Sequence, residues 1–123
     1  MPELPEVETV VRFVRPQLVG RTINQISTSP KNLHMAWQNY WNSEVVGKRI
    51  QAVDRRGKWI LLALSDGKSH LVVHLGMTGR LVVVPRSEPV MKHTHLIFSL
   101  DRGKWHLRYQ DPRRFGSVRW ILQ

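Results

Sequence analysis

Apolar residues near the start of the chain recur every three or four positions, at Val7, Val10, Val11, Val14 and Leu18. This is the spacing of one face of an α-helix, so the pattern predicts a helix over residues 7–18. Pro5 suits the first turn of a helix, where a backbone N–H needs no partner, and Glu6 and Glu8 suit the positive end of the helix dipole. Pro16 stands too late to start a helix, so we expect it to end or kink this one, with Gly20 as the stop signal.

From position 47 onward the pattern changes to short apolar or alternating runs separated by turn residues. The runs typical of strands are Arg49–Asp54, Trp59–Leu64, Ser69–His74, Arg80–Val84, His95–Leu100, Lys104–Tyr109 and Gly116–Leu122, with a mixed one at Thr22–Ser29. Such a series predicts a mainly β fold, either an antiparallel sandwich or a barrel. Of these we expect a two-sheet β-sandwich of about seven or eight short strands with the N-terminal α-helix packed on it.

The pattern decides least between residues 31 and 44. Leu33, Met35, Trp37, Tyr40 and Trp41 lie there among polar residues. A short helix from Met35 to Ser43 fits, with its aromatic side chains used for packing. The chain shows no repeat and no linker, and its 123 residues suit one domain.

Charge adds information about the partner. The chain has 19 Lys and Arg against 9 Asp and Glu, a net charge of +10, which favours a polyanion and most often nucleic acid. A solubilising basic surface or an RNA-binding ribosomal protein is the alternative. Because the chain has no cysteine, it has no disulfide, thiolate or zinc-finger chemistry. No apolar run reaches the length of about 18 residues that a membrane span needs, and the acidic start is unlike a signal peptide, so we expect a soluble cytoplasmic protein.

Candidate chemistry begins at the second residue. If Met1 is removed, which the small residue after it allows, Pro2 becomes the N-terminus and presents a secondary amine. An α-amino group has an ordinary pKa of about 7.7–8.0, and the following helix dipole disfavours its charged form. Attack by such an amine on a carbonyl or sugar carbon gives an iminium ion, which makes elimination possible. Glu3 and Glu6 lie beside it, although capping the helix and complementing its dipole would also explain them.

The opening octet MPELPEVE resembles the start of the formamidopyrimidine-DNA glycosylases, which begin PELPEVET once the methionine is gone. The likeness continues in the family's order and at close to its spacing through GKWILL (Gly57–Leu62), HLGMTGRL (His74–Leu81), KHTH (Lys92–His95) and YQDPRRFG (Tyr109–Gly116). It covers essentially the whole chain but only the N-terminal half of the family's architecture. The resemblance therefore implies a single N-terminal catalytic domain over 1–123, without the C-terminal helix-two-turn-helix and zinc finger and hence without a cofactor.

The family removes oxidised purines from DNA and then cuts the strand by lyase chemistry. The resemblance implies that Pro2 attacks C1′ of the damaged nucleotide and that Glu3 acts as general acid or base. It also implies that Glu6 is an electrostatic partner and that Lys58 holds a phosphate, whereas a lysine at a strand entrance is otherwise usually solvated. The octet is of the purine-repair type, so 8-oxoguanine and formamidopyrimidine are the implied targets, followed by β- and δ-elimination.

Two turns carry residues suited to a distorted duplex. Met77 lies on a glycine-flanked turn, and Arg113 and Phe115 lie on another. The resemblance implies that these three fill the void left when the damaged nucleotide is turned out, a step that costs a few kcal/mol of stacking and pairing. Phe115 can recover stacking, Met77 fills volume and Arg113 can hydrogen-bond the opposite base. A lone methionine otherwise more often fills a gap in the core.

The histidines allow a second interpretation. His93 and His95 would share one face of a strand and could form half of a metal site, but no carboxylate or third ligand stands at a supporting spacing, so we expect no metal. The resemblance instead makes His74 and His93 phosphate contacts, with Lys92 adding charge.

Two other functions fit part of the pattern. A non-catalytic basic module would bind damaged or distorted DNA without chemistry at Pro2. A small-molecule tautomerase also uses an N-terminal proline as a base, but it starts with a strand where this chain predicts a helix. We expect a monomer that binds double-stranded DNA containing oxidised bases or abasic sites, with weak binding and activity in the absence of the family's C-terminal half.

Overall fold

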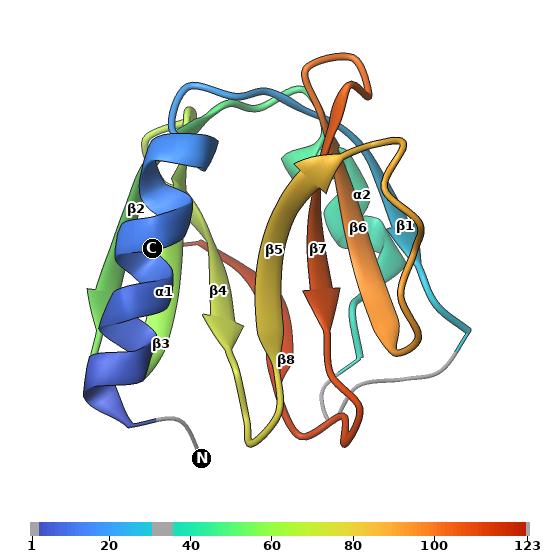
Figure 1. Ribbon diagram of the computed structural model, residues 1–123. Helices are drawn as coiled ribbons and strands as arrows, with labels where there is room; N and C mark the ends of the chain where they lie inside the picture. Colours follow the sequence, from blue (N-terminus) through green and yellow to red (C-terminus); the bar gives the residue numbers. More distant parts are fainter. Residues whose placement is uncertain (1–2, 31–35, 123) are drawn as a thin grey trace.

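In the part of the chain that the computed structural model describes, residues 3–30 and 36–122, eight strands form two four-stranded antiparallel sheets (Figure 1). One sheet has the order β1-β6-β7-β5, made of Ile23–Thr28, Thr94–Leu100, Trp105–Gln110 and Arg80–Pro85. The other has the order β2-β3-β4-β8, made of Ile50–Arg56, Trp59–Leu64, Ser69–His74 and Ser117–Leu122. The predicted β-sandwich with an N-terminal helix is confirmed, and individual strand bounds shift only slightly.

The helix α1 (Leu4–Leu18) packs against β2 and β5, which are edge strands of the two different sheets. Its predicted stripe is the face that it buries: Val7, Val11, Val14 and Leu18 are at most 1% exposed. Burying a side chain of this kind contributes about 1.5–3 kcal/mol, so α1 is fixed to both sheets by one row of aliphatic residues.

We expected Pro16 to end or kink the helix, and of these two outcomes the ending was wrong, because α1 continues through Pro16 to Leu18. A proline removes one backbone donor and crowds the preceding turn, but here the buried Val14 and Leu18 hold the last turn against the sheets. Gly20 is the stop that the sequence indicated: it follows the helix with a φ of 91° and donates its N–H to the carbonyl of Ile50.

The undecided segment forms a 3-10 turn η1 (Asn39–Trp41) followed by the short helix α2 (Asn42–Val45), not one helix from Met35 to Ser43. Met35 itself lies outside the described residues. Trp37 packs edge-on against Phe98 of the core, with 5.7 Å between ring centroids, and donates its indole N–H to Asn42. Trp37 is therefore a packing residue, as expected. No helix within residues 3–30 and 36–122 has the length and apolar character needed to cross a membrane.

Candidate nucleic-acid interface

Strand register gathers the candidate residues at one end of the sandwich, the lower end in Figure 1. At this end β2 turns into β3, β4 and β7 finish, and β5, β6 and β8 begin. The cross-strand partners there are Trp59–His74, His74–Ser117, Arg80–Gln110 and Thr94–Gln110. Antiparallel pairing thus brings four connections, far apart in the sequence, together with the first turn of α1.

The start of α1 places two carboxylates and an ammonium close to one another. Glu3 precedes the helix, and its backbone N–H donates to Oε1 of Glu6 at 3.3 Å. Lys58, in the β2–β3 turn, has its Nζ 4.0 Å from Oε2 of Glu3. Both of these side chains reach solvent, so the pair adds little stability. Glu6 therefore caps the helix. Pro2, the predicted nucleophile, lies outside the described residues and directly precedes Glu3 in the chain.

A further acid, Glu8, which the sequence indicated only as a complement to the helix dipole, fixes α1 to the β2–β3 hairpin. Glu8 accepts hydrogen bonds from Nε of Arg55 at 2.8 Å and from Nε of Arg12 at 2.9 Å, and these bonds hold its pKa below the ordinary value. Arg55 also donates to the carbonyl of Gly57 at 2.9 Å. The turn that carries Lys58 is therefore tied to the first turns of the helix. Glu8 and Arg12 are four residues apart, a spacing that predicts a contact on a helix. Nothing local in the sequence indicated that Arg55 would also bind Glu8.

His74 ends β4 next to this turn and is held as a neutral imidazole. Burial lowers its pKa, and the charge of Lys58 lowers it further. Its ring packs edge-on against Trp59, with 4.7 Å between centroids, and its Nδ1 lies 3.1 Å from the N–H of Gly76. Since Nδ1 accepts this bond, the proton of the neutral ring belongs on Nε2, which is then a donor suited to a phosphate oxygen.

Changing Lys58 to methionine is expected to raise the pKa of His74, because the neighbouring positive charge disappears while burial remains. NMR titration of the imidazole signals measures this directly. Lys68→Met, in the β3–β4 turn at the opposite end of the sandwich, is the matched control and should leave the titration unchanged. An unaltered His74 in the Lys58 variant, or equal shifts in both variants, would contradict the proposed proximity.

The loops after β4 and β7, residues 75–79 and 111–116, present the three side chains predicted to enter the duplex. We call them the glycine loops. Met77 is 46% exposed and Phe115 is 48% exposed, so Met77 does not fill a core gap. The guanidinium carbon of Arg113 lies 4.9 Å from the centroid of the Phe115 ring. An apolar chain, an aromatic ring and a cation thus project from one end of the fold.

Asp111 is the residue that holds the glycine loops together, and sequence reasoning named it only as part of a motif. Its carboxylate is fully buried. Oδ1 accepts from the hydroxyl of Thr78 at 2.7 Å and from the N–H of Arg114 at 3.1 Å. Oδ2 accepts from the hydroxyl of Tyr109 and from the N–H of Gly116, both at 2.9 Å. Strand alternation through Leu107 and Tyr109 would have placed Asp111 on the buried face.

Gly76 lets the backbones of the two loops touch, and Gly79 and Gly116 leave room for the groups packed beneath them. A Cβ at Gly76 would lie 2.5 Å from the nitrogen of Gly116 and 2.7 Å from the carbonyl carbon of Phe115. A Cβ at Gly79 would collide with the hydroxyl of Tyr109, and one at Gly116 would collide with that hydroxyl and with the carbonyl of His74. The two loops therefore act as one unit, because neither can shift without the other.

The start of β6 adds a basic rim to this unit. His93 has a φ of 66° and precedes the strand, which begins at Thr94, so it does not share a strand face with His95. The backbone carbonyl of His93 accepts from the N–H of Asp111 at 2.9 Å, and the buried ring of His95 contacts the carbonyl of Asp111 at 2.7 Å. Lys92 and His93 line a hollow that also includes Thr78. Within the described residues no cluster of three or more His, Cys, Asp or Glu side chains could hold a metal.

The family model described as the formamidopyrimidine-DNA glycosylase N-terminal domain matches residues 1–118. The chain belongs to this glycosylase family. Curated formamidopyrimidine-DNA glycosylases from Marinomonas sp. and Desulforamulus reducens are 43% and 46% identical over 100% and 96% of the chain. The chain spans 44% and 43% of the lengths of these two relatives. The resemblance inferred from the motifs is thus confirmed as a match to an N-terminal domain.

Solved structures of a family member share this fold. Lactococcus lactis Fpg in complex with DNA containing an abasic site superimposes with a TM-score of 0.88 and 33% identity, over 99% of this chain and 45% of that one. The same protein with DNA containing FAPY-dG gives 0.87 and 34%, over 98% and 44%. The glycosylase domain described above is therefore similar to one that has been solved with damaged DNA.

Proposed function

We propose that the chain is the catalytic N-terminal domain of a base-excision repair enzyme, a DNA glycosylase with lyase activity that removes oxidised purines such as 8-oxoguanine and formamidopyrimidine. One observation carries the proposal. The start of α1, the turn with Lys58 and the glycine loops lie together at one end of the sandwich, and Met77 and Phe115 are exposed there. The net charge of +10 supports a nucleic-acid partner.

In the proposed reaction the unprotonated nitrogen of Pro2 bonds to C1′ of the damaged nucleotide, and the bond from C1′ to the base breaks, with the base leaving as a protonated species. Opening of the sugar ring then gives an iminium ion between Pro2 and C1′. Glu3, next in the chain, is the proposed acid and base for these proton transfers. Loss of a proton from C2′ expels the 3′ phosphate by β-elimination, and loss of a proton from C4′ expels the 5′ phosphate by δ-elimination. Water then hydrolyses the iminium, which releases the sugar fragment and restores the amine of Pro2. Glu6 supports the iminium charge electrostatically.

The remaining candidates bind the duplex in this proposal. Lys58 holds a phosphate beside the lesion, and His74, Lys92 and His93 contact neighbouring phosphates. Met77, Arg113 and Phe115 occupy the space of the extruded nucleotide, offsetting the few kcal/mol that extrusion costs. Phe115 is suited to stacking, and Arg113 lies against it, where its donors can reach the opposite base.

The chain spans less than half of its relatives' length. The activity and the partners given above are therefore proposed for a whole enzyme of this family, of which the chain is one domain. We propose that these 123 residues act as a monomer with weak DNA affinity when alone, because the other half of the family's DNA grip lies elsewhere. The family zinc finger belongs to that half, and we propose no cofactor for these residues.

Borohydride trapping tests the chemistry. The protein is incubated with duplex DNA containing one abasic site and sodium borohydride, and the adduct is digested and mapped by mass spectrometry. We expect a reduced bond at the nitrogen of Pro2, after loss of Met1, and trapping slowed more than about tenfold, or ~1.4 kcal/mol, by Pro2→Gly. Lys68→Gln, which removes an amine from the opposite end, should trap as the wild type does. Binding without any adduct would favour the non-catalytic module.

A further inference from the structure

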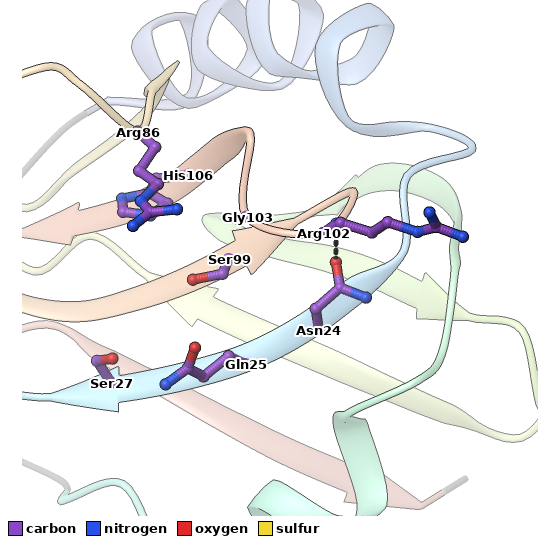
Figure 2. A pocket seen from close by; sticks show the side chains of 8 residues that line it. All are labelled: Asn24, Gln25, Ser27, Arg86, Ser99, Arg102, Gly103 and His106. Atoms are coloured by element: carbon purple, nitrogen blue, oxygen red, sulfur yellow. Dashed lines mark hydrogen bonds between the residues drawn. The ribbon is translucent and has the colours of Figure 1, made fainter.

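A polar hollow lies on the outward face of the β1-β6-β7-β5 sheet, beside the turn between β6 and β7 (Figure 2). Gln25 pairs with Ser99, and Ser99 pairs with His106, so these three residues form one row across β1, β6 and β7. Ser99 alternates with the core residues Phe98 and Leu100, and the row therefore faces away from the other sheet. The β6–β7 turn is at the end of the sheet opposite to the glycine loops, so the hollow is separate from the candidate interface.

The groups around this row are hydrogen-bond donors. Arg86 is exposed and reaches across the turn, with its Nη1 3.9 Å from where a Cβ on Gly103 would lie. Figure 2 shows its guanidinium group beside the ring of His106 and above the hydroxyl of Ser99. The described residues that line the hollow include no aspartate or glutamate. A site that offers donors and positive charge without a carboxylate suits an oxyanion.

The ring of His106 is oriented by a buried cation. Nε of Arg108 lies 3.3 Å from Nδ1 of His106 and donates to it, so the proton of the neutral ring belongs on Nε2. Burial lowers the pKa of His106, and the charges of Arg108 and Arg86 lower it further. The neutral imidazole thus offers the hollow an N–H donor.

Arg108 supplies the strongest reason to expect an anion nearby. It is 1% exposed, and its guanidinium group binds the carbonyls of Glu88 at 2.8 Å and Pro89 at 3.1 Å as well as His106. No carboxylate of the described residues forms an ion pair with it. A buried charge without a counter-ion is unfavourable, and Arg108 contacts the row directly through the ring of His106. A negative charge in the hollow would offset it.

We propose that this hollow binds a phosphate group through Arg86, His106, Ser99 and Gln25. We call it the outer-sheet site. Its volume of about 450 Å³ exceeds that of one phosphate, so it can take either the free ion or a phosphodiester with part of its nucleotide. The proposal does not depend on the lyase chemistry at the other end of the domain.

NMR titration with inorganic phosphate, against sodium chloride at matched ionic strength, tests the site. We expect saturable shifts of the amides of Ser99, Gly103 and His106, and an apparent Kd raised at least about tenfold by Arg86→Gln, because a charge-assisted hydrogen bond is lost. Arg86 is exposed, so this variant should keep the wild-type spectrum elsewhere. Arg12→Gln removes the same charge from the exposed face of α1 and should bind as the wild type does. Absence of saturation, or equal weakening in both variants, would overturn the proposal.

A second arm distinguishes the source of the phosphate. A single-stranded oligothymidylate is titrated into the wild type and the Arg86→Gln variant, with the same three amides observed. Shifts that depend on Arg86 and exceed those from inorganic phosphate at equal phosphate concentration would support the phosphodiester form of the proposal. Shifts from inorganic phosphate alone would support the free-ion form. If neither ligand shifts these amides, the outer-sheet site does not exist.

Discussion

Replacing Gly116 with alanine is expected to lower the free energy of unfolding by about 3 kcal/mol or more. The new Cβ would collide with the hydroxyl of Tyr109 and the carbonyl of His74 and would lie 3.0 Å from Oδ2 of Asp111. Two of these three atoms belong to a hydrogen-bonded group buried between the sheets, so they cannot move aside without losing partners. Urea denaturation followed by tryptophan fluorescence measures the loss, and the melting temperature should fall by about 4 °C per kcal/mol.

Gly67→Ala is the matched control for this change. Gly67 lies in the β3–β4 turn with a φ of 75°, and no atom lies within 4 Å of the added Cβ. The substitution should therefore cost only the strain of alanine in a left-handed backbone conformation, about 1–2 kcal/mol. A second variant removes the colliding hydroxyl: in a Tyr109→Phe background, Gly116→Ala should cost less than it does alone. Equal losses for Gly116→Ala and Gly67→Ala would show that the glycine loops have room to separate.

Replacing Asp111 with asparagine is expected to destabilise the domain by about 3 kcal/mol and to loosen both glycine loops. The carboxylate accepts four hydrogen bonds, from Thr78, Arg114, Tyr109 and Gly116. An amide has one acceptor oxygen, so its NH₂ group must face the donors on one side of the cluster, and the bonds that these donors make to the carboxylate are lost. Hydrogen exchange of the Arg114 and Gly116 amides should accelerate beyond the change expected from global stability.

Asp54→Asn provides the comparison for this acid. Asp54 is exposed in β2, and its nearest cation, Arg15, lies 3.7 Å away, an arrangement that contributes no more than about 1 kcal/mol. The Asp54 variant should leave exchange at Arg114 and Gly116 unchanged. If Asp111→Asn unfolds at the same urea concentration as Asp54→Asn, with unchanged exchange in both, Asp111 does not organise the loops.

Local pattern was enough to predict the framework. The stripe from Val7 to Leu18 and the alternating strand runs reflect which face each element buries, and that face is decided within a few residues of sequence. Pro16 shows the limit of local rules, because the packing of Val14 and Leu18 against two sheets outweighed the preference of one residue.

Site residues could be predicted from the sequence where they lie in a motif, but not where their role depends on a contact between distant positions. Lys58, Met77 and Phe115 could be chosen because each lies within a contiguous motif, whereas the bond from Thr78 to Asp111 joins residues 33 positions apart. The same holds for Arg108, which local alternation places on an outward face but which the segment after β5 covers. The role of Pro2 stays a prediction, since it lies outside the described residues.

The backbone contact between the two glycine loops separates what can vary from what cannot. Met77 and Phe115 point outward and contribute nothing to the bonds beneath them, so evolution or an engineer can exchange these tips for other shapes at little cost in folding. The glycines and Asp111 cannot be replaced one at a time without a loss of stability. A graft of the two loops from another protein would therefore need to transplant both segments together with the aspartate.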